Sequence, residues 1–123
     1  MDTILWIIQC LLSAVFAMAG WGKISSSKQQ HIADGHIEPE NSVIPIRILG
    51  ALEWLGSIGI IVPWLIGILP MLTPAAAVCF GLIMISGLII HTRKKEYKIL
   101  PLLTFLLILS AVVAYFRIKQ LTL

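Results

Sequence analysis

Four long apolar runs dominate the sequence, and each has about the ~20 residues that an α-helix needs to cross the hydrocarbon core of a bilayer. Thr73-Pro74 suits the start of the third run, with Thr73 as the capping residue, and Pro101 lies in the first turn of the fourth. We therefore expect an all-α, integral membrane four-helix bundle that forms a single transmembrane domain over residues 1–123. It has short loops and one longer polar loop after the first helix, and its spans are residues 3–21, 43–63, 73–91 and 99–117.

The composition indicates that lipid surrounds this fold. Of the residues, 59% are hydrophobic and 12% are charged, and the mean hydropathy of +0.97 excludes an ordinary soluble globule. The nine Lys and Arg residues outnumber six acids, but they occur singly or in one short run between apolar segments. This pattern is typical of membrane topology signals, so membrane lipids are expected partners and nucleic acid is not.

The basic residues also predict how the chain is oriented in a cell membrane. One side of the four spans collects most of them, whereas the other has only Arg117 and Lys119, beside Asp2. By the positive-inside rule the long first loop and the 91–98 loop are cytoplasmic, and both termini lie outside. Because Asp2 and no basic residue precedes the first run, we expect a retained helix and not a cleaved signal peptide. The residues on the cytoplasmic side are Lys23, Lys28, Arg47, Arg93, Lys94, Lys95 and Lys98.

The first loop and the two cysteines match no established metal or redox motif. Three serines precede residues 28–34, and Gly35 closes this stretch, which predicts one short interfacial helix. Cys10 and Cys79 lie in apolar runs without a C-x-x-C spacing, so we expect buried small side chains, with a disulfide as the alternative. The loop residues of metal-binding type have no zinc or calcium spacing, and we expect a solvated loop and no metal site. They are His31, Asp34, His36, Glu38 and Glu40.

Glu53 is the most informative residue, because it lies inside the second span. It follows Arg47 by nearly two helical turns, ~9 Å deeper in the membrane, where a carboxylate without a partner is costly. Glu53 should therefore face the bundle, and the candidate partners at the same end are Lys23, Arg47 and His91. Two interpretations of this cluster stay open: an ion pair that fixes helix packing, or a ligand site.

A pocket beside Glu53 is the natural place for a ligand. On the third span Met84, Gly87 and His91 share one face, which could line such a pocket. Further candidates for its lining are Trp21, Trp54 and Ser57. Small residues recur on the first three spans and favour close packing of the helices. We assign no catalytic residue, since no histidine pair lies within the spans and no phosphate loop or serine nucleophile elbow is present.

Three motifs on the first three spans belong together. They are Ala19-Gly20-Trp21-Gly22-Lys23-Ile24, Arg47-x-x-Gly50-Ala51-Leu52-Glu53 with Gly56 and Pro63, and Leu72-Thr73-Pro74-Ala75-Ala76 running to Met84 and His91. This combination resembles the DoxX-like family over about three of the four spans. The resemblance implies a four-helix membrane bundle whose recurring polar positions are Lys23, Glu53, Arg47 and His91.

The resemblance implies two kinds of role. Some DoxX-like relatives are associated with membrane redox systems as partners of quinone-linked oxidoreductases or of thiol and superoxide defence. A eukaryotic branch that resembles residues 50–53 is a chaperone in the assembly of nicotinic acetylcholine receptors. Since no redox ligand set is visible, we expect first a non-enzymatic accessory or assembly protein that binds other membrane proteins, with a homo-oligomer as a further arrangement.

The main alternative is a subunit of a membrane redox system that binds a quinone or another lipophilic ligand. A bound quinone or lipid is then the one cofactor-like molecule to expect. A small proton-coupled transporter is less favoured, because Glu53 lies in the second span with Lys23 near it and the Lys/Arg asymmetry is strong.

Overall fold

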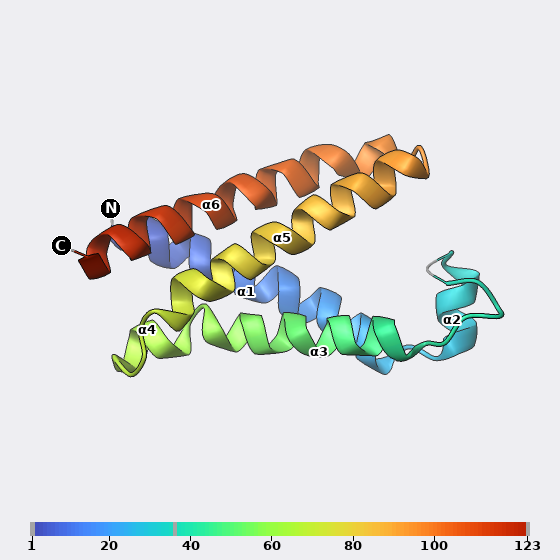
Figure 1. The fold of residues 1–123 in the computed structure, drawn as a ribbon, viewed down its shortest axis with the longest axis horizontal. Coiled ribbons are helices and arrows are strands. Elements are labelled where there is room, and N and C mark those ends of the chain that lie inside the picture. The colour runs from blue at the N-terminus through green and yellow to red at the C-terminus, as the bar shows by residue number, and fades with distance from the viewer. Residues whose placement is uncertain (1, 36, 123) are drawn as a thin grey trace.

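The computed structural model describes residues 2–35 and 37–122 (Figure 1). This part of the chain is 82% helical and has no strand, which confirms the all-α prediction. Its elements are α1 (Asp2–Ser25), α2 (Lys28–Ala33), α3 (Ile44–Gly59), α4 (Val62–Ile66), α5 (Leu72–Arg93), the 3-10 helix η1 (Tyr97–Ile99) and α6 (Leu100–Thr122).

Four helical segments of the described chain are long and apolar enough to cross a membrane. They are Asp2–Ser25, Ile44–Ile66, Leu72–Arg93 and Tyr97–Thr122, so the predicted four-helix, multi-pass membrane protein is confirmed. Most helix ends lie a few residues beyond the predicted spans. Hydropathy marks where the apolar run stops, whereas helical hydrogen bonding continues into polar residues such as Lys23 and Ser25.

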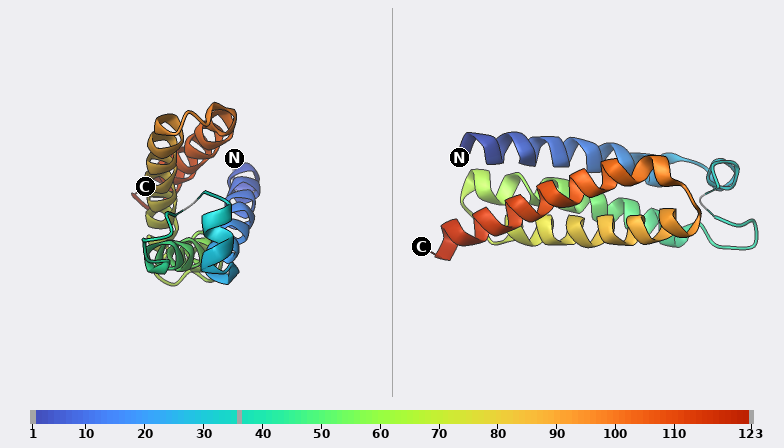
Figure 2. Two further views of the ribbon diagram at one scale, coloured as in Figure 1. Left: turned by 90° about the vertical axis from the view of Figure 1, so that its right-hand side faces the viewer. Right: turned by 90° about the horizontal axis from the view of Figure 1, so that it is seen from above.

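The spans form two antiparallel pairs, α1 with α3 and α5 with α6 (Figure 2). Glycines let the first pair approach closely. A Cβ atom on Gly20 would lie 2.7 Å from the Gly50 carbonyl oxygen, and one on Gly50 would lie 2.8 Å from the Gly20 carbonyl oxygen. Because Cβ atoms are not found so near other atoms, the α1–α3 crossing requires small residues at both positions.

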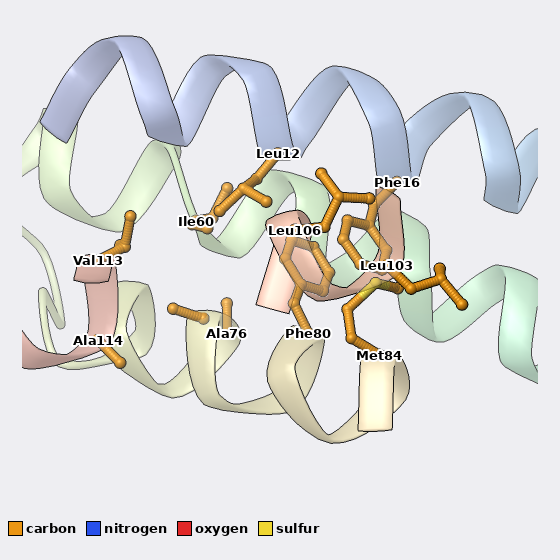
Figure 3. Packing of buried hydrophobic residues seen from close by; sticks show 11 residues of the cluster. Leu12, Phe16, Ile60, Ala76, Phe80, Met84, Leu103, Leu106, Val113 and Ala114 are labelled. Atoms are coloured by element: carbon orange, nitrogen blue, oxygen red, sulfur yellow. The ribbon is translucent and has the colours of Figure 1, made fainter. Parts of the chain in front are cut away.

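The two pairs meet over one apolar core (Figure 3). At its centre the rings of Phe16 and Phe80 stack with centroids 3.8 Å apart. Phe80 also covers Gly56, where a Cβ atom would lie 2.5 Å from the Phe80 ring. The buried core residues are Leu12, Phe16, Ile60, Ala76, Ala77, Phe80, Met84, Leu103, Leu106, Val113 and Ala114.

The second span is interrupted at Ile60 and Ile61, between α3 and α4. Pro63 stands in the first turn of α4, where its missing N–H leaves a carbonyl without its usual helical partner. Lipid cannot hydrogen-bond such carbonyls, so other spans must do it. The donors are Gln9 Nε2 to Ile60 O (2.6 Å), Ser13 Oγ to Ser57 O (2.9 Å) and Thr73 Oγ1 to Gly59 O (3.1 Å).

The predicted capping role of Thr73 is wrong. Helix α5 begins at Leu72, its N-cap is Met71, and no side chain caps it. The buried Thr73 hydroxyl instead donates to Gly59 O of the neighbouring span, where an exposed carbonyl would otherwise be costly. The start of α6 is as predicted, with Pro101 in its first turn.

The short helix predicted in the first loop is confirmed as α2. Ser27 caps it by accepting a hydrogen bond from Gln30 N at 3.1 Å, and Gly35 follows with φ +76°. The sequence predicted a solvated loop, and this is wrong at His31. That side chain is buried, and its Nε2 lies 3.3 Å from Lys23 O. His36 lies outside the described residues.

The expectation of buried cysteines is also wrong. Cys10 and Cys79 are free thiols, and both are exposed on the outer surface of the bundle. Their chain neighbours Gln9 and Phe80 occupy the inward-facing positions instead. In a bundle of four helices each helix buries only one stripe of its surface, so an apolar residue in a span often faces lipid.

Candidate functional site

The only carboxylate within the described second span, Glu53, lies in an ion pair between α3 and α1. Lys23 Nζ is 2.8 Å from Glu53 Oε1, and the glutamate is 1% exposed. The close approach at Gly20 and Gly50 brings the two helices near enough for this contact. A buried carboxylate therefore has its charge partner on the adjacent helix of the same pair.

The ion pair leaves hydrogen-bonding capacity on the carboxylate. Glu53 Oε1 is inaccessible to solvent, and Lys23 Nζ at 2.8 Å is its charge partner. A carboxylate has about four acceptor sites and an ammonium has about three donors, so one contact does not use them all, and the Lys23 side chain is 30% exposed. Glu53 can thus still accept a hydrogen bond, and Lys23 can still donate one.

A cavity of about 600 Å³ opens beside this pair, and all four spans contribute to its walls. Its lining is overwhelmingly apolar, and its ionisable residues are Lys23, Glu53 and His91. The predicted face of Met84, Gly87 and His91 does line it. The other lining residues are Val15, Phe16, Ala19, Leu49, Leu82, Ile83, Ser86, Ile90, Leu102, Leu103 and Leu106.

The cavity lies where the two helix pairs diverge, at the end of the bundle that carries α2 (Figure 1). The apolar core stops at Phe16, Met84 and Leu103 on the side facing this end. Beyond that level no described residue from 85 to 102 is buried. The α5–α6 pair therefore has no packed partner there, and the cavity occupies the space.

Arg47 and His91 do not contact Glu53. Arg47 donates from Nη1 to Ile24 O (2.6 Å) and from Nη2 to Ser26 O (3.3 Å), and so completes the carbonyl end of α1. His91 lines the cavity, but its Nδ1 lies 3.2 Å from Glu96 Oε1, within its own helix pair. The structure thus joins Lys23 with Glu53 and places Arg47 outside the cavity.

The three further lining candidates lie elsewhere. Trp21 is 60% exposed on the surface, with its ring centroid 6.3 Å from that of Trp54. Trp54 Nε1 donates to Ala17 O at 2.9 Å, and Ser57 Oγ donates to Glu53 O at 2.8 Å. Both side chains line a smaller groove of about 280 Å³ between α1 and α3. Helical spacing alone could not tell which of these faces turns inward.

A second buried polar cluster is centred on Arg117. The sequence marks this arginine only as a topology signal and does not predict the cluster. Arg117 is 0% exposed, and it lies at the α4 end of the bundle because its guanidinium lies over the ring of Trp64 in α4. Its Nε donates to Gln9 Oε1 (2.8 Å), and its Nη1 donates to Asp2 Oδ1 (2.6 Å) and Gln120 Oε1 (2.7 Å). The guanidinium thereby connects α6 to α1.

Aromatic rings complete the surroundings of Arg117. Its guanidinium carbon lies 4.4 Å from the centroid of the Trp64 ring and 5.5 Å from that of Trp6. Gln9 links Arg117 to the second span, because its amide nitrogen donates to Ile60 O at the interruption of that span. The one sequence signal that could have revealed this cluster is Gln9 itself, an amide inside an otherwise apolar run.

Comparison with known proteins agrees with the motifs. The model of the DoxX-like family matches residues 7–114, which reach from the first span into the fourth. No curated protein and no solved structure matches the chain. The match extends the resemblance carried by the first three spans to most of the chain. The chain belongs to the DoxX-like family, as a multi-pass helical membrane protein.

Proposed function

We propose that this DoxX-like protein binds a lipophilic molecule with a polar headgroup, of the quinone or lipid class, inside its bundle. The observation that carries the proposal is the cavity of about 600 Å³, whose mainly apolar wall contains the Lys23–Glu53 ion pair. Sites for small ligands commonly have this volume and this ratio of apolar surface to a few polar groups.

The polar groups suit a headgroup that can both donate and accept. Glu53 lines the cavity, and its contact with Lys23 uses only part of the acceptor capacity of the carboxylate, so a ligand hydroxyl or amide could donate to it. Lys23 Nζ could donate to a ligand carbonyl or phosphate oxygen in return. An ionisable pair inside a membrane span is costly to maintain, which favours a functional role for it.

The apolar walls suit the tail of the same molecule. Leu82, Ile83 and Leu106 line the cavity on α5 and α6. Gly87 faces the same space and leaves room there, because a Cβ atom on it would meet only Leu103 at an ordinary 3.5 Å. A larger side chain at this position would fill the cavity without forcing the helices apart.

The test is binding of decylubiquinone to the purified protein in detergent, followed by native mass spectrometry. We expect Gly87→Leu to weaken binding at least tenfold. Gly81→Leu is the matched control, since Gly81 lies on the same helix against Leu107 (3.6 Å) and does not line the cavity. Equal binding by both variants, or no recovery of any quinone or lipid with the unaltered protein, would overturn the proposal.

An accessory or assembly role is the competing proposal, and the Lys23–Glu53 pair would then serve only to hold α1 against α3. It requires that loss of the pair damages folding and partner binding together. In either case we place the cavity end of the bundle in the cytoplasmic half of the membrane, because most Lys and Arg residues lie at that end.

A further inference from the structure

Hydrogen bonds that join the two helix pairs gather at the α4 end. Arg117 of α6 bonds Asp2 and Gln9 of α1, and Thr73 of α5 donates to Gly59 O of α3. The chain itself passes from one pair to the other only once, through residues 67–71 at this same end. Covalent and polar connections between the pairs therefore coincide.

Among the described residues, the ion pairs at the α2 end each lie within one helix pair. Lys23 and Glu53 join α1 to α3, and His91 and Glu96 both belong to the α5–α6 hairpin. One bond crosses between the pairs near this end, from the exposed Lys94 Nζ to Gly35 O at 3.1 Å. A single exposed contact of this kind contributes little to holding two helix pairs together.

Apolar packing follows the same gradient. The shared core runs from Ala114 and Ala76 toward Phe16 and Met84 and ends there, where the cavity begins. Within each pair, by contrast, packing is maintained: Gly20 and Gly50 touch across α1 and α3, and Gly87 lies near Leu103 across α5 and α6. Each pair is thus a unit, and the contact between units is strong at one end only.

We infer that the α4 end is a pivot about which the two helix pairs open and close the cavity at the α2 end. We define the pivot by the cross-pair contacts of Arg117 with Asp2 and Gln9 and of Thr73 with Gly59. Domain closure around ligands commonly uses rigid units and a short connection of this kind. The inference that the cavity closes when a ligand binds rests on the proposed function, whereas the pivot itself does not.

The inference is tested by distances between paired spin labels in full-length protein in nanodiscs, with Cys10 and Cys79 changed to Ser. One pair of labels, Ser25→Cys with Lys98→Cys, spans the α2 end, and the other, Ile7→Cys with Lys119→Cys, spans the α4 end; all four sites are exposed. Without ligand we expect a broad distance distribution at the α2 end and a narrow one at the α4 end. Addition of decylubiquinone should narrow the distance distribution at the α2 end and shift it to shorter distances. The distribution at the α4 end should stay unchanged.

The outcomes separate the pivot from the proposed function. If quinone does not bind, the proposed function fails, and the pivot is judged on the ligand-free distributions: equal widths at the two ends overturn it. If quinone binds and the two ends shift alike, or neither shifts, the pivot is wrong while the proposed function stands.

A variant that releases the pivot provides an independent readout. Arg117→Leu should broaden the distribution at the α4 end, and Arg117→Lys, which keeps a cation, should broaden it less. If Arg117→Leu does not fold, Thr73→Val removes one cross-pair hydrogen bond at nearly constant shape and should act in the same direction. Unchanged α4-end distances in both the leucine and the valine variants would overturn the pivot.

Discussion

The bundle has a buried ionic cluster at each end, and the two differ in their surroundings. At the α4 end Arg117 is surrounded by Gln9, Asp2 and two tryptophan rings, and it does not line the cavity. At the α2 end Glu53 has one partner, Lys23, and it faces a cavity of about 600 Å³. Burial of a charge is therefore not what distinguishes a candidate ligand site here. The distinguishing feature is the open space beside Glu53, because Arg117 also keeps unused hydrogen-bonding capacity, with its Nη2 buried without a hydrogen-bond partner among the described residues.

The comparison predicts that loss of Arg117 destabilises the fold most. Arg117→Met removes a charge-assisted hydrogen bond to Gln9 and leaves that amide oxygen without its donor, so we expect about 3 kcal/mol less free energy of unfolding. Asp2 is 64% exposed and adds little to this loss. Equilibrium unfolding in mixed micelles measures the loss of unfolding free energy in Arg117→Met.

Lys119→Met is the control on the same helix, because Lys119 is exposed and its ammonium lies 5.8 Å from the centroid of the Tyr115 ring, away from the Arg117 cluster's hydrogen bonds. It should change the free energy of unfolding by less than about 0.5 kcal/mol. Similar losses in the two variants would show that the α4-end cluster is not a structural connection.

The second prediction concerns the helix crossing that brings Lys23 to Glu53. Gly50→Ala would put a Cβ atom 2.8 Å from Gly20 O and 2.9 Å from Lys23 Cβ, so α1 and α3 must separate, at a cost of about 2 kcal/mol. Gly22→Ala, with no atom within 4 Å of the added Cβ, should be neutral or slightly stabilising. The measurement is again equilibrium unfolding, and equal effects of the two alanines would contradict the close approach.

The third prediction separates stability from binding at the α2 end. Glu53→Gln should weaken decylubiquinone binding about tenfold, the equivalent of ~1.4 kcal/mol. It should cost less than about 1 kcal/mol of unfolding free energy, because the partly exposed Lys23 side chain can extend toward the headgroups once its partner is neutral. Titration of ligand and unfolding of the same preparations measure both quantities.

Glu96→Gln is the control for Glu53→Gln, since it removes a carboxylate that contacts His91 but does not line the cavity. It should leave binding within twofold of the unaltered protein. Parallel loss of stability and of binding in Glu53→Gln would favour the assembly role over the ligand site.

The smallest expected effect is that of Thr73→Val. This change keeps the shape of the side chain and removes the hydrogen bond to Gly59 O, at a cost of about 1 kcal/mol. Thr122→Val, at the exposed end of α6, should have almost no effect. Faster amide hydrogen exchange near residues 60–64 in the first variant alone would locate the loss at the interruption of the second span.

Sequence reasoning finds Lys23 and Glu53 readily, because charged residues stand out in or beside apolar runs. It also groups Arg47 with Glu53, since both lie at one end of one helix. Six residues on an α-helix turn through about 600°, so the two side chains point to faces ~120° apart. Arg47 therefore completes the carbonyl end of α1 and does not meet Glu53.

For Arg47 the sequence suggested a contact that the structure lacks, whereas for Arg117 the structure has contacts that the sequence did not suggest. An arginine at the end of an apolar run is expected to extend to the headgroups, and nothing local indicates otherwise. Its burial depends on Gln9 and Asp2, more than a hundred positions earlier, and on the Trp64 ring. Only the packing of α6 against α1 brings these groups together.

The sequence by itself determined the medium, the number of spans and the family, because hydropathy over ~20 residues and short motifs act through local physical chemistry. The tertiary structure alone decided which face of each helix turns inward, and hence which polar residues meet. In lipid every span is apolar all round, so periodicity does not mark the inner face as it does in water. That is why the partner of Glu53 was one of several candidates in the sequence, and why the cavity beside it became visible only in the folded bundle.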